Sequence, residues 1–114
     1  MNIQTMTMLL AAMCAVESGN NPEAYNAKEN AVGILQIREL AVRDINREFG
    51  TEYELDDFYN PVLSRWAVLQ YGKMWGADCP ESFARTWNGG PKGMKKESTI
   101  EYWHRVKAIF RENP

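Results

Sequence analysis

A single glutamate, Glu17, is the residue best suited to acid–base chemistry, because it closes an apolar helical stretch. It continues a stripe of apolar residues that recur every three or four positions: Ile3, Met6, Leu10 and Met13. Apolar surroundings and the negative end of a helix dipole both disfavour the ionised form of a carboxyl group. A carboxylic acid that donates a proton near neutral pH needs such a setting. The pattern makes Glu17 a candidate general acid, and the alternative is a last-turn glutamate that points into water.

Three short motifs follow one another along the chain. They are Glu17-Ser18 with Asn21-Pro22 behind it, then Gly33-Ile34-Leu35-Gln36-Ile37, then Trp87-Asn88-Gly89-Gly90-Pro91 followed by Thr99, Tyr102, Trp103 and Val106. Each motif alone is weak, but three motifs in order with compatible spacing are far more specific. From Met13 to Val106 the sequence resembles the soluble lytic transglycosylases of the lysozyme-like superfamily, and it is similar to goose-type lysozymes. The short chain resembles a phage-type single domain.

The resemblance implies a role for each matching residue. Glu17 matches the catalytic glutamate, and Ser18 matches the serine beside it. Substrate-binding positions are implied for Gly33, Leu35 and Gln36, which line the floor of the sugar groove in this family, and for Trp87, Asn88 and Tyr102. Asn88 matches an asparagine expected to face the groove, and Tyr102 matches a late tyrosine near the catalytic carboxyl.

The chain departs from the family pattern at several positions. The family has tyrosine where Trp87 stands and alanine where Gly89 stands. The segment Gly-Leu-Met-Gln of the family reads Gly-Ile-Leu-Gln here, and a serine of the first loop is replaced by Ala27. These departures affect the contacts expected from the loops and leave the acid itself in place.

The implied substrate is bacterial peptidoglycan, and the bond is the β-1,4 link between N-acetylmuramic acid and N-acetylglucosamine. Glu17 would protonate the leaving oxygen as general acid. In a lytic transglycosylase the resulting carboxylate then removes the proton of the muramic C6 hydroxyl, which attacks C1 and gives a 1,6-anhydro end. The substrate's acetamido group can stabilise the positive charge at C1, so that no second carboxylate is needed.

A hydrolytic muramidase is the alternative activity. An inverting hydrolase needs a second carboxylate about 6.5–9.5 Å from the first, to activate water. Glu29 is the best candidate for this base, because it leads directly into the Gly33–Ile37 segment. Glu23 is a further candidate in the same loop, and Asp56 and Asp57 are weaker ones. We rank the lytic transglycosylase above the muramidase.

Aromatic and basic residues near the motifs allow two interpretations. Most tryptophans of a small helical domain belong to the core, so that we expect Trp66 and Trp103 there, and Trp87 and Tyr25 in the groove. Three lysines lie in the Pro91–Lys96 segment: Lys92, Lys95 and Lys96. They could pair with carboxylates of the peptide stems, or they could form a solvated basic loop.

Helical periodicity, proline and capping signals predict a mainly helical, lysozyme-like α+β fold. About five helices are expected around a glycan-binding groove: Gln4–Glu17, Gly33 to just before Gly50, Pro61–Trp75, one from Pro80 to Asn88, and one that starts at Ser98 or Thr99. Asn88–Gly93 is predicted to be a loop, because three glycines and a proline do not fit inside a helix. At most a small hairpin is expected, in Asn20–Val32 or Thr51–Leu55.

Length and composition limit the classes of function. The 114 residues suggest one domain, residues 1–114, and 45% hydrophobic residues are ordinary for a globular protein. The net charge of −2 gives no support for a nucleic-acid partner. Cys14 and Cys79 have no metal-ligand spacing, and we expect two thiols rather than a disulfide. No metal and no cofactor are expected.

The sequence also suggests where the protein acts and what else it could be. The N-terminal segment lacks the basic region of a secretory signal, and its apolar run is too short to span a membrane. We therefore expect no membrane insertion. We expect a monomer that acts on peptidoglycan strands in the periplasm or host envelope. It would be a phage-encoded enzyme released through a holin, a virion-associated enzyme, or part of a secreted parent protein. Two competing hypotheses are a binding module that grips glycan without cutting it and a structural helical protein. The presence of Glu17 favours the enzyme over the binding module. A structural protein would give no reason for the Asn88–Gly93 and Gly33–Gln36 segments to occur together.

Overall fold

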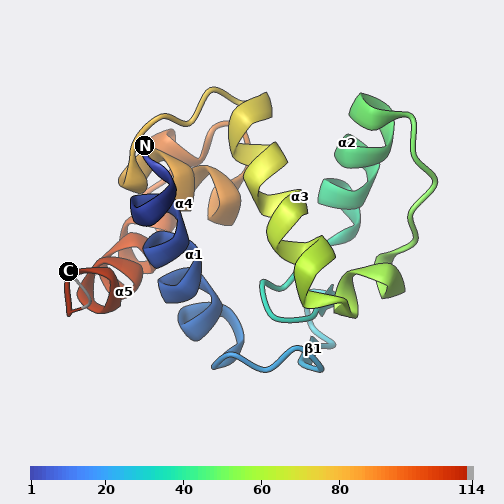
Figure 1. Ribbon diagram of the computed structural model, residues 1–114, viewed down its shortest axis with the longest axis horizontal. Helices are drawn as coiled ribbons and strands as arrows, with labels where there is room; N and C mark the ends of the chain where they lie inside the picture. The colour runs from blue at the N-terminus through green and yellow to red at the C-terminus, as the bar shows by residue number, and fades with distance from the viewer. Residues whose placement is uncertain (113–114) are drawn as a thin grey trace. The chain divides into compact units, whose positions relative to one another are not determined.

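The computed structural model describes residues 1–112 and contains five α-helices and one small hairpin (Figure 1). The elements in chain order are α1 Ile3–Ser18, β1 Tyr25–Asn26, β2 Ala31–Val32, α2 Glu39–Phe49, the 3-10 helix η1 Leu55–Tyr59, α3 Pro61–Met74, α4 Pro80–Gly89, the 3-10 helix η2 Gly93–Lys95 and α5 Ser98–Glu112. The expected mainly helical fold with five helices and a hairpin within Asn20–Val32 is confirmed.

The chain forms two compact units, which we describe separately. The first unit contains residues 1–16 and the chain from residue 72 onward, and the second contains residues 17–71. The boundaries between them fall within α1 and within α3. Of the motif residues, Glu17 therefore belongs to the second unit, and Asn88 belongs to the first.

The first unit is built on the start of α1, on α4 and on α5. Leu10 and Met13 of α1 are buried, as the apolar stripe predicts, and so is Leu9, which lies outside the stripe. Met6 is half-buried, and Ile3 is 86% exposed and lies outside the core. Proline at the first position and a cap from Cys79 start α4, which buries Phe83, Ala84 and Trp87. Helix α5 packs against α4 and buries Tyr102 and Val106, whereas Ile100 is 38% exposed.

The second unit contains the hairpin, α2, η1 and the start of α3. Strands β1 and β2 are antiparallel, and Tyr25 faces Val32 in the register. An aromatic cluster supports this unit: Tyr53 lies with its ring centroid 5.6 Å from that of Phe58 and 6.3 Å from that of Trp66, and Phe49 stacks 5.0 Å from Trp66. Helix α2 buries Val42 and Ile45.

The prediction that a helix begins at Gly33 is wrong. Residues 33–36 form a tight loop, because Val32 and Ile37 exchange two backbone hydrogen bonds of 2.9 Å each. Gly33 has φ +82 and Gln36 has φ +55, and left-handed residues do not continue an α-helix. The helix begins only at Glu39. Ile34 and Ile37 are buried as expected, but as loop residues.

The third motif also differs from its predicted conformation. Asn88 and Gly89 form the end of α4 instead of a loop, and the chain leaves the helix at Gly90, which has φ +87. A short 3-10 turn, η2, then leads to α5. The glycines were expected to exclude helix throughout Asn88–Gly93. However, Gly89 lies at the last helical position, where its cost is small.

We expected Trp66 and Trp103 to be more buried than Trp87, and the structure shows the reverse. Trp87 is only 6% exposed, whereas Trp66 and Trp103 are half-buried. Cys14 is buried and Cys79 is exposed, and the two form no disulfide. Within residues 1–112, no helix is both long enough and apolar enough to cross a membrane.

Candidate active site

Glu17 occupies the last turn of α1, a helix with no basic residue in that turn. Its side chain is half-buried. Among the carboxylates of residues 17–71, only Glu17 and Asp44 are not exposed, and Asp44 is engaged by Arg47 at 2.6 Å. A partly desolvated carboxylate at a helix C-terminus is the setting that suits a proton donor. Glu17 is thus the one glutamate of residues 17–71 that is half-buried, and its role as general acid stays a prediction.

Ser18 ties the end of α1 to the Gly33–Gln36 loop. Its hydroxyl donates a hydrogen bond of 2.8 Å to the carbonyl oxygen of Ile34 and accepts one of 3.1 Å from the backbone N–H of Asn21. Gly19 and Asn20, both with φ +64, turn the chain sharply away from the helix. The last turn, which includes Glu17, is therefore fixed to the second motif through the adjacent serine.

The Gly33–Gln36 loop is held largely by backbone hydrogen bonds. The N–H of Gly33 donates to the carbonyl oxygen of Ala24 at 2.8 Å, and the side-chain amide of Gln36 donates to the carbonyl oxygen of Gly33 at 3.0 Å. Gly33 leaves no room for a side chain, because a Cβ there would lie 2.5 Å from the carbonyl oxygen of Phe58. Leu35 is completely buried, so that it packs the loop into the core of this unit and exposes no surface to a ligand.

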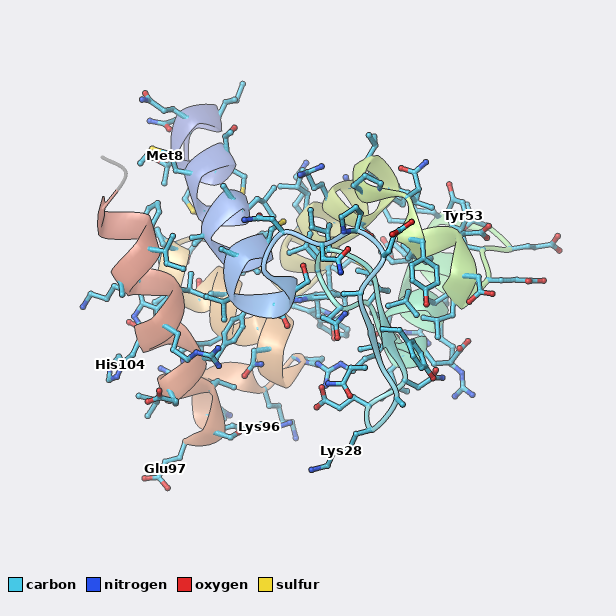
Figure 2. The ribbon with its side chains drawn as sticks, turned by 90° about the horizontal axis from the view of Figure 1, so that it is seen from below. Met8, Lys28, Tyr53, Lys96, Glu97 and His104 are labelled. Atoms are coloured by element: carbon cyan, nitrogen blue, oxygen red, sulfur yellow. The ribbon has the colours of Figure 1, made fainter. Side chains whose placement is uncertain are left out.

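Glu29 lies in the turn between β1 and β2 and is exposed. The side-chain oxygen of Asn26 accepts a hydrogen bond of 3.2 Å from the backbone N–H of Glu29, and the Tyr25 hydroxyl donates to the side-chain oxygen of Asn30 at 2.9 Å. Lys28, in the same turn, projects away from the ribbon (Figure 2). The turn is thus ordered by its own asparagines, and its carboxylate belongs to the same unit as Glu17.

The candidate residues are divided between the two units. Glu17, Ser18, Glu29, Gly33, Leu35 and Gln36 lie in residues 17–71, and Trp87, Asn88 and Tyr102 lie in the other unit. Trp87 and Tyr102 are 6% and 7% exposed, and Asn88, at the end of α4, is half-buried. Because two of these three side chains are buried, Asn88 is the most accessible of them.

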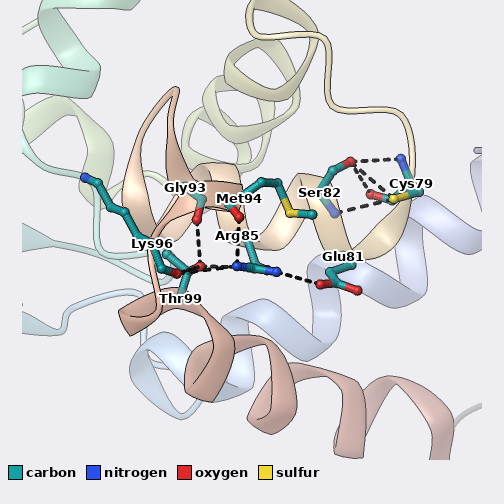
Figure 3. Close-up of polar contacts among 8 residues, drawn as sticks. All are labelled: Cys79, Glu81, Ser82, Arg85, Gly93, Met94, Lys96 and Thr99. Carbon is teal, nitrogen blue, oxygen red and sulfur yellow. Dashed lines mark hydrogen bonds and ion pairs between the residues drawn. The ribbon is translucent and has the colours of Figure 1, made fainter.

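Sequence reasoning missed Arg85, which is buried at the centre of a polar network between α4, η2 and α5 (Figure 3). Its guanidinium group donates to Glu81, to Thr99 and to backbone oxygens of the loop after α4. The only feature of the sequence that could have indicated its burial is its position between the apolar residues of α4. Within residues 1–112, no group of three or more His, Cys, Asp or Glu side chains is arranged to hold a metal ion.

Comparison with known proteins identifies the family. Residues 2–108 match the model of the Transglycosylase SLT domain. The chain belongs to this family, within the lysozyme-like superfamily. A lysozyme from Magallana gigas is 33% identical to this SLT domain over 106 residues, which cover 85% of this chain and 74% of that protein. A lysozyme from Meretrix lusoria is 35% identical over 107 residues, covering 88% of this chain and 86% of that protein.

A solved structure supports the same conclusion. A chain in the crystal structure of Aeromonas hydrophila PliI in complex with Meretrix lusoria lysozyme is 30% identical to this SLT domain, with a TM-score of 0.74. The match covers 90% of this chain and 88% of that chain. The SLT domain therefore has the lysozyme-like fold, and it is an enzyme of the class that cleaves the glycan strands of peptidoglycan in the cell wall.

Proposed function

We propose that this SLT domain is a lytic transglycosylase that cuts the β-1,4 bond between N-acetylmuramic acid and N-acetylglucosamine, with Glu17 as acid and then base. The observation that carries the proposal is the position of Glu17. It is the half-buried carboxylate at the end of an apolar helix, and the next residue, Ser18, is bonded to the Gly33–Gln36 loop. The family match over residues 2–108 supports the same reaction.

The reaction needs one carboxyl group and no water. Protonated Glu17 gives its proton to the glycosidic oxygen as the bond from C1 breaks, and the acetamido group of the substrate stabilises the positive charge at C1. The carboxylate of Glu17 then takes the proton of the muramic C6 hydroxyl, whose oxygen bonds to C1. The products are a free N-acetylglucosamine end and a 1,6-anhydromuramic end, and Glu17 is protonated again.

The remaining residues have supporting roles in this proposal. Ser18 holds the last turn of α1 to the loop, so that Glu17 has a fixed orientation. In residues 17–71 the Gly33–Gln36 segment, and in the other unit Asn88 with the small exposed parts of Trp87 and Tyr102, are proposed as substrate-binding positions. We further propose that the chain acts as one catalytic domain and as a monomer, which analytical ultracentrifugation can check.

A hydrolytic muramidase is the second candidate, because the similar proteins from Magallana gigas and Meretrix lusoria are both named lysozyme. In that case Glu29, which is exposed in the β1–β2 turn of the same unit as Glu17, would activate the water. The two activities make different muramic ends. Hydrolysis leaves a reducing end, and transglycosylation leaves an anhydro end that is lighter by one water molecule.

Mass spectrometry of muropeptides released from purified sacculi tests the proposal. We expect anhydromuramic ends from the wild type, a loss of roughly 10²–10⁴-fold in rate for Glu17→Gln, and little change for Glu29→Gln. Glu48→Gln, which removes an exposed carboxylate on α2 of the same unit, is the control for Glu29. Reducing ends that disappear in Glu29→Gln would establish the muramidase instead. Glycan binding without release by the folded wild type would leave only a binding module.

A further inference from the structure

The guanidinium group of Arg85 makes most of its hydrogen bonds to the segment between α4 and α5 and to the start of α5. Arg85 is 8% exposed, and its Nε donates to Thr99 Oγ1 at 2.8 Å. Its Nη2 lies 3.1 Å from the carbonyl oxygen of Met94 and 3.4 Å from that of Lys96, and its Nη1 donates to Glu81 at 2.7 Å. Three of these four partners belong to the segment from η2 to the start of α5. The buried charge therefore organises this segment rather than a pair of helices alone.

Thr99 completes the arrangement from the side of α5. Its side chain is completely buried, and its Oγ1 lies 2.8 Å from the carbonyl oxygen of Gly93 and 2.8 Å from that of Lys96. The hydroxyl accepts the hydrogen bond of Arg85 and donates its own proton to one of these carbonyls. The Lys96 ammonium group in turn donates to the carbonyl oxygen of Gly89 at 2.7 Å, at the end of α4.

Two glycines allow this close packing. A Cβ at Gly93 would overlap the carbonyl oxygen of Arg85, and one at Gly89 would lie 2.5 Å from Cγ2 of Thr99. The Gly90–Lys96 loop is thus pressed against α4 and α5 and fixed by charged hydrogen bonds. Figure 3 shows Arg85 and Thr99 at the centre of these contacts. Asn88 lies one residue before the end of α4 and is adjacent to Gly89, whose carbonyl oxygen accepts the hydrogen bond of Lys96.

We propose that Arg85 and Thr99 are positioning residues for substrate binding, which hold Asn88 and the Gly90–Lys96 loop in the conformation that contacts the glycan strand. The inference rests on the proposed function. Stability alone gives little reason for a buried arginine, because an apolar residue of similar volume is often as stabilising as a buried ion pair. The core of this unit is already filled by apolar side chains, among them Phe83, Ala84 and Val106. An apolar residue, however, would provide no hydrogen-bond donors to hold the carbonyl groups of the loop in place.

The test compares two substitutions of Thr99, of which one removes the hydroxyl group and the other removes the methyl group. Thr99→Val removes the hydroxyl group and keeps the shape, whereas Thr99→Ser keeps the hydroxyl. With soluble peptidoglycan oligomers, well below the unfolding temperature of every variant, we expect Thr99→Val to raise KM roughly three- to tenfold with kcat within about twofold. Thr99→Ser should stay within about twofold of the wild type in both constants.

A second pair of variants guards against a loss of folding. Arg85→Lys keeps the positive charge but cannot reach several partners at once, and it should raise KM in the same way. Arg105→Lys, on an exposed position of α5, is its control and should change nothing. Lys96→Met removes only the exposed contact to Gly89 and should have a smaller effect than Arg85→Lys.

The outcomes separate the inference from the proposed function. If Thr99→Val and Arg85→Lys unfold more easily but keep the wild-type KM, the network is only structural and the inference is wrong. Binding to sacculi, measured in the Glu17→Gln background, gives a readout that needs no turnover. If the wild type releases no product but Thr99→Val still weakens this binding relative to Thr99→Ser, the proposed function fails and the positioning role stands. If the wild type neither binds nor cleaves, both fail.

Discussion

The second motif forms the Gly33–Gln36 loop and the third leads into the Gly90–Lys96 loop, but different kinds of hydrogen bond hold the two loops. The Gly33–Gln36 loop is closed by backbone pairs, of Val32 with Ile37 and of Gly33 with Ala24. The Gly90–Lys96 loop has backbone bonds of its own, such as those of Gly93 with Gly90 and of Lys96 with Gly93, but the side chains of Arg85 and Thr99 attach it to α4 and α5. One loop therefore depends on backbone conformation, and the other depends on particular functional groups.

This difference determines which substitutions each loop tolerates. A backbone-closed loop is sensitive wherever a side chain would force the chain into strain or into another segment. A loop closed by side chains is sensitive to the loss of one donor or acceptor, because the buried partners stay behind without a bond. The two loops should therefore differ in how strongly they respond to glycine substitutions and to polar deletions.

The largest loss of stability is expected from Gly33→Ala. Gly33 has φ +82, and a Cβ would also lie 2.5 Å from the carbonyl oxygen of Phe58. Strain and overlap add, so that we expect the free energy of unfolding to fall by about 3–4 kcal/mol in urea titrations. Gly50→Ala is the control, since Gly50 has φ +63 but nothing within 4 Å of the added Cβ. It should cost about 1 kcal/mol, and equal losses would show that overlap with Phe58 plays no part.

Gly93→Ala tests the other loop. Here the backbone is not left-handed, and the cost arises only because a Cβ would overlap the carbonyl oxygen of Arg85. Overpacking of this kind costs about 2 kcal/mol, and displacement of the loop should also raise KM. Lys95→Ala, an exposed substitution in the same loop, should leave the unfolding free energy unchanged. A Gly93→Ala variant with normal KM would argue that the loop does not contact the substrate.

The helices that position Glu17 and Asn88 could be predicted from sequence, because proline starts, capping residues and apolar periodicity are local signals. Helix α3 begins at Pro61 and α4 at Pro80, as predicted. The Gly33–Ile37 loop could not be separated from a first helical turn in this way. Ile34, Ile37 and Ile45 have helical spacing and are all buried, so that periodicity indicates their burial but not their backbone conformation. The left-handed conformation of Gly33 and Gln36 carries no comparable pattern.

The role of Arg85 was beyond sequence reasoning for a different reason. Its loop partners are backbone oxygens of Met94 and Lys96, and any residue type provides a backbone oxygen. No complementary pattern of side chains therefore marks the network. Trp87 was similarly misjudged, because its position beside glycines suggested exposure while its place on the buried face of α4 decided its burial.

Ser18→Ala should have an intermediate effect. The substitution removes the hydrogen bond of 2.8 Å to the carbonyl oxygen of Ile34, which is a partly buried acceptor. We expect a loss of about 1 kcal/mol in unfolding free energy and a clear fall in kcat, because Glu17 lies in the turn that this bond holds. Thr7→Ala is the control on the same helix. It also removes a hydroxyl bond of 2.8 Å to a carbonyl, but at an exposed position. Equal effects on kcat would exclude a special role for Ser18.

The smallest effect on KM is expected from substitution of two exposed lysines in the Gly90–Lys96 loop. Lys96 is engaged by Gly89, whereas Lys92 and Lys95 are exposed in the same loop. If they pair with peptide-stem carboxylates, the double variant Lys92→Ala/Lys95→Ala should raise KM about two- to fivefold at low salt and less at high salt, because exposed charges are screened. Lys28→Ala/Lys73→Ala removes the same charge from exposed positions elsewhere and is the control. Equal changes of KM in the two double variants would mean that only the net charge of the protein matters for binding to peptidoglycan. Lys92 and Lys95 would then make no specific contact with it.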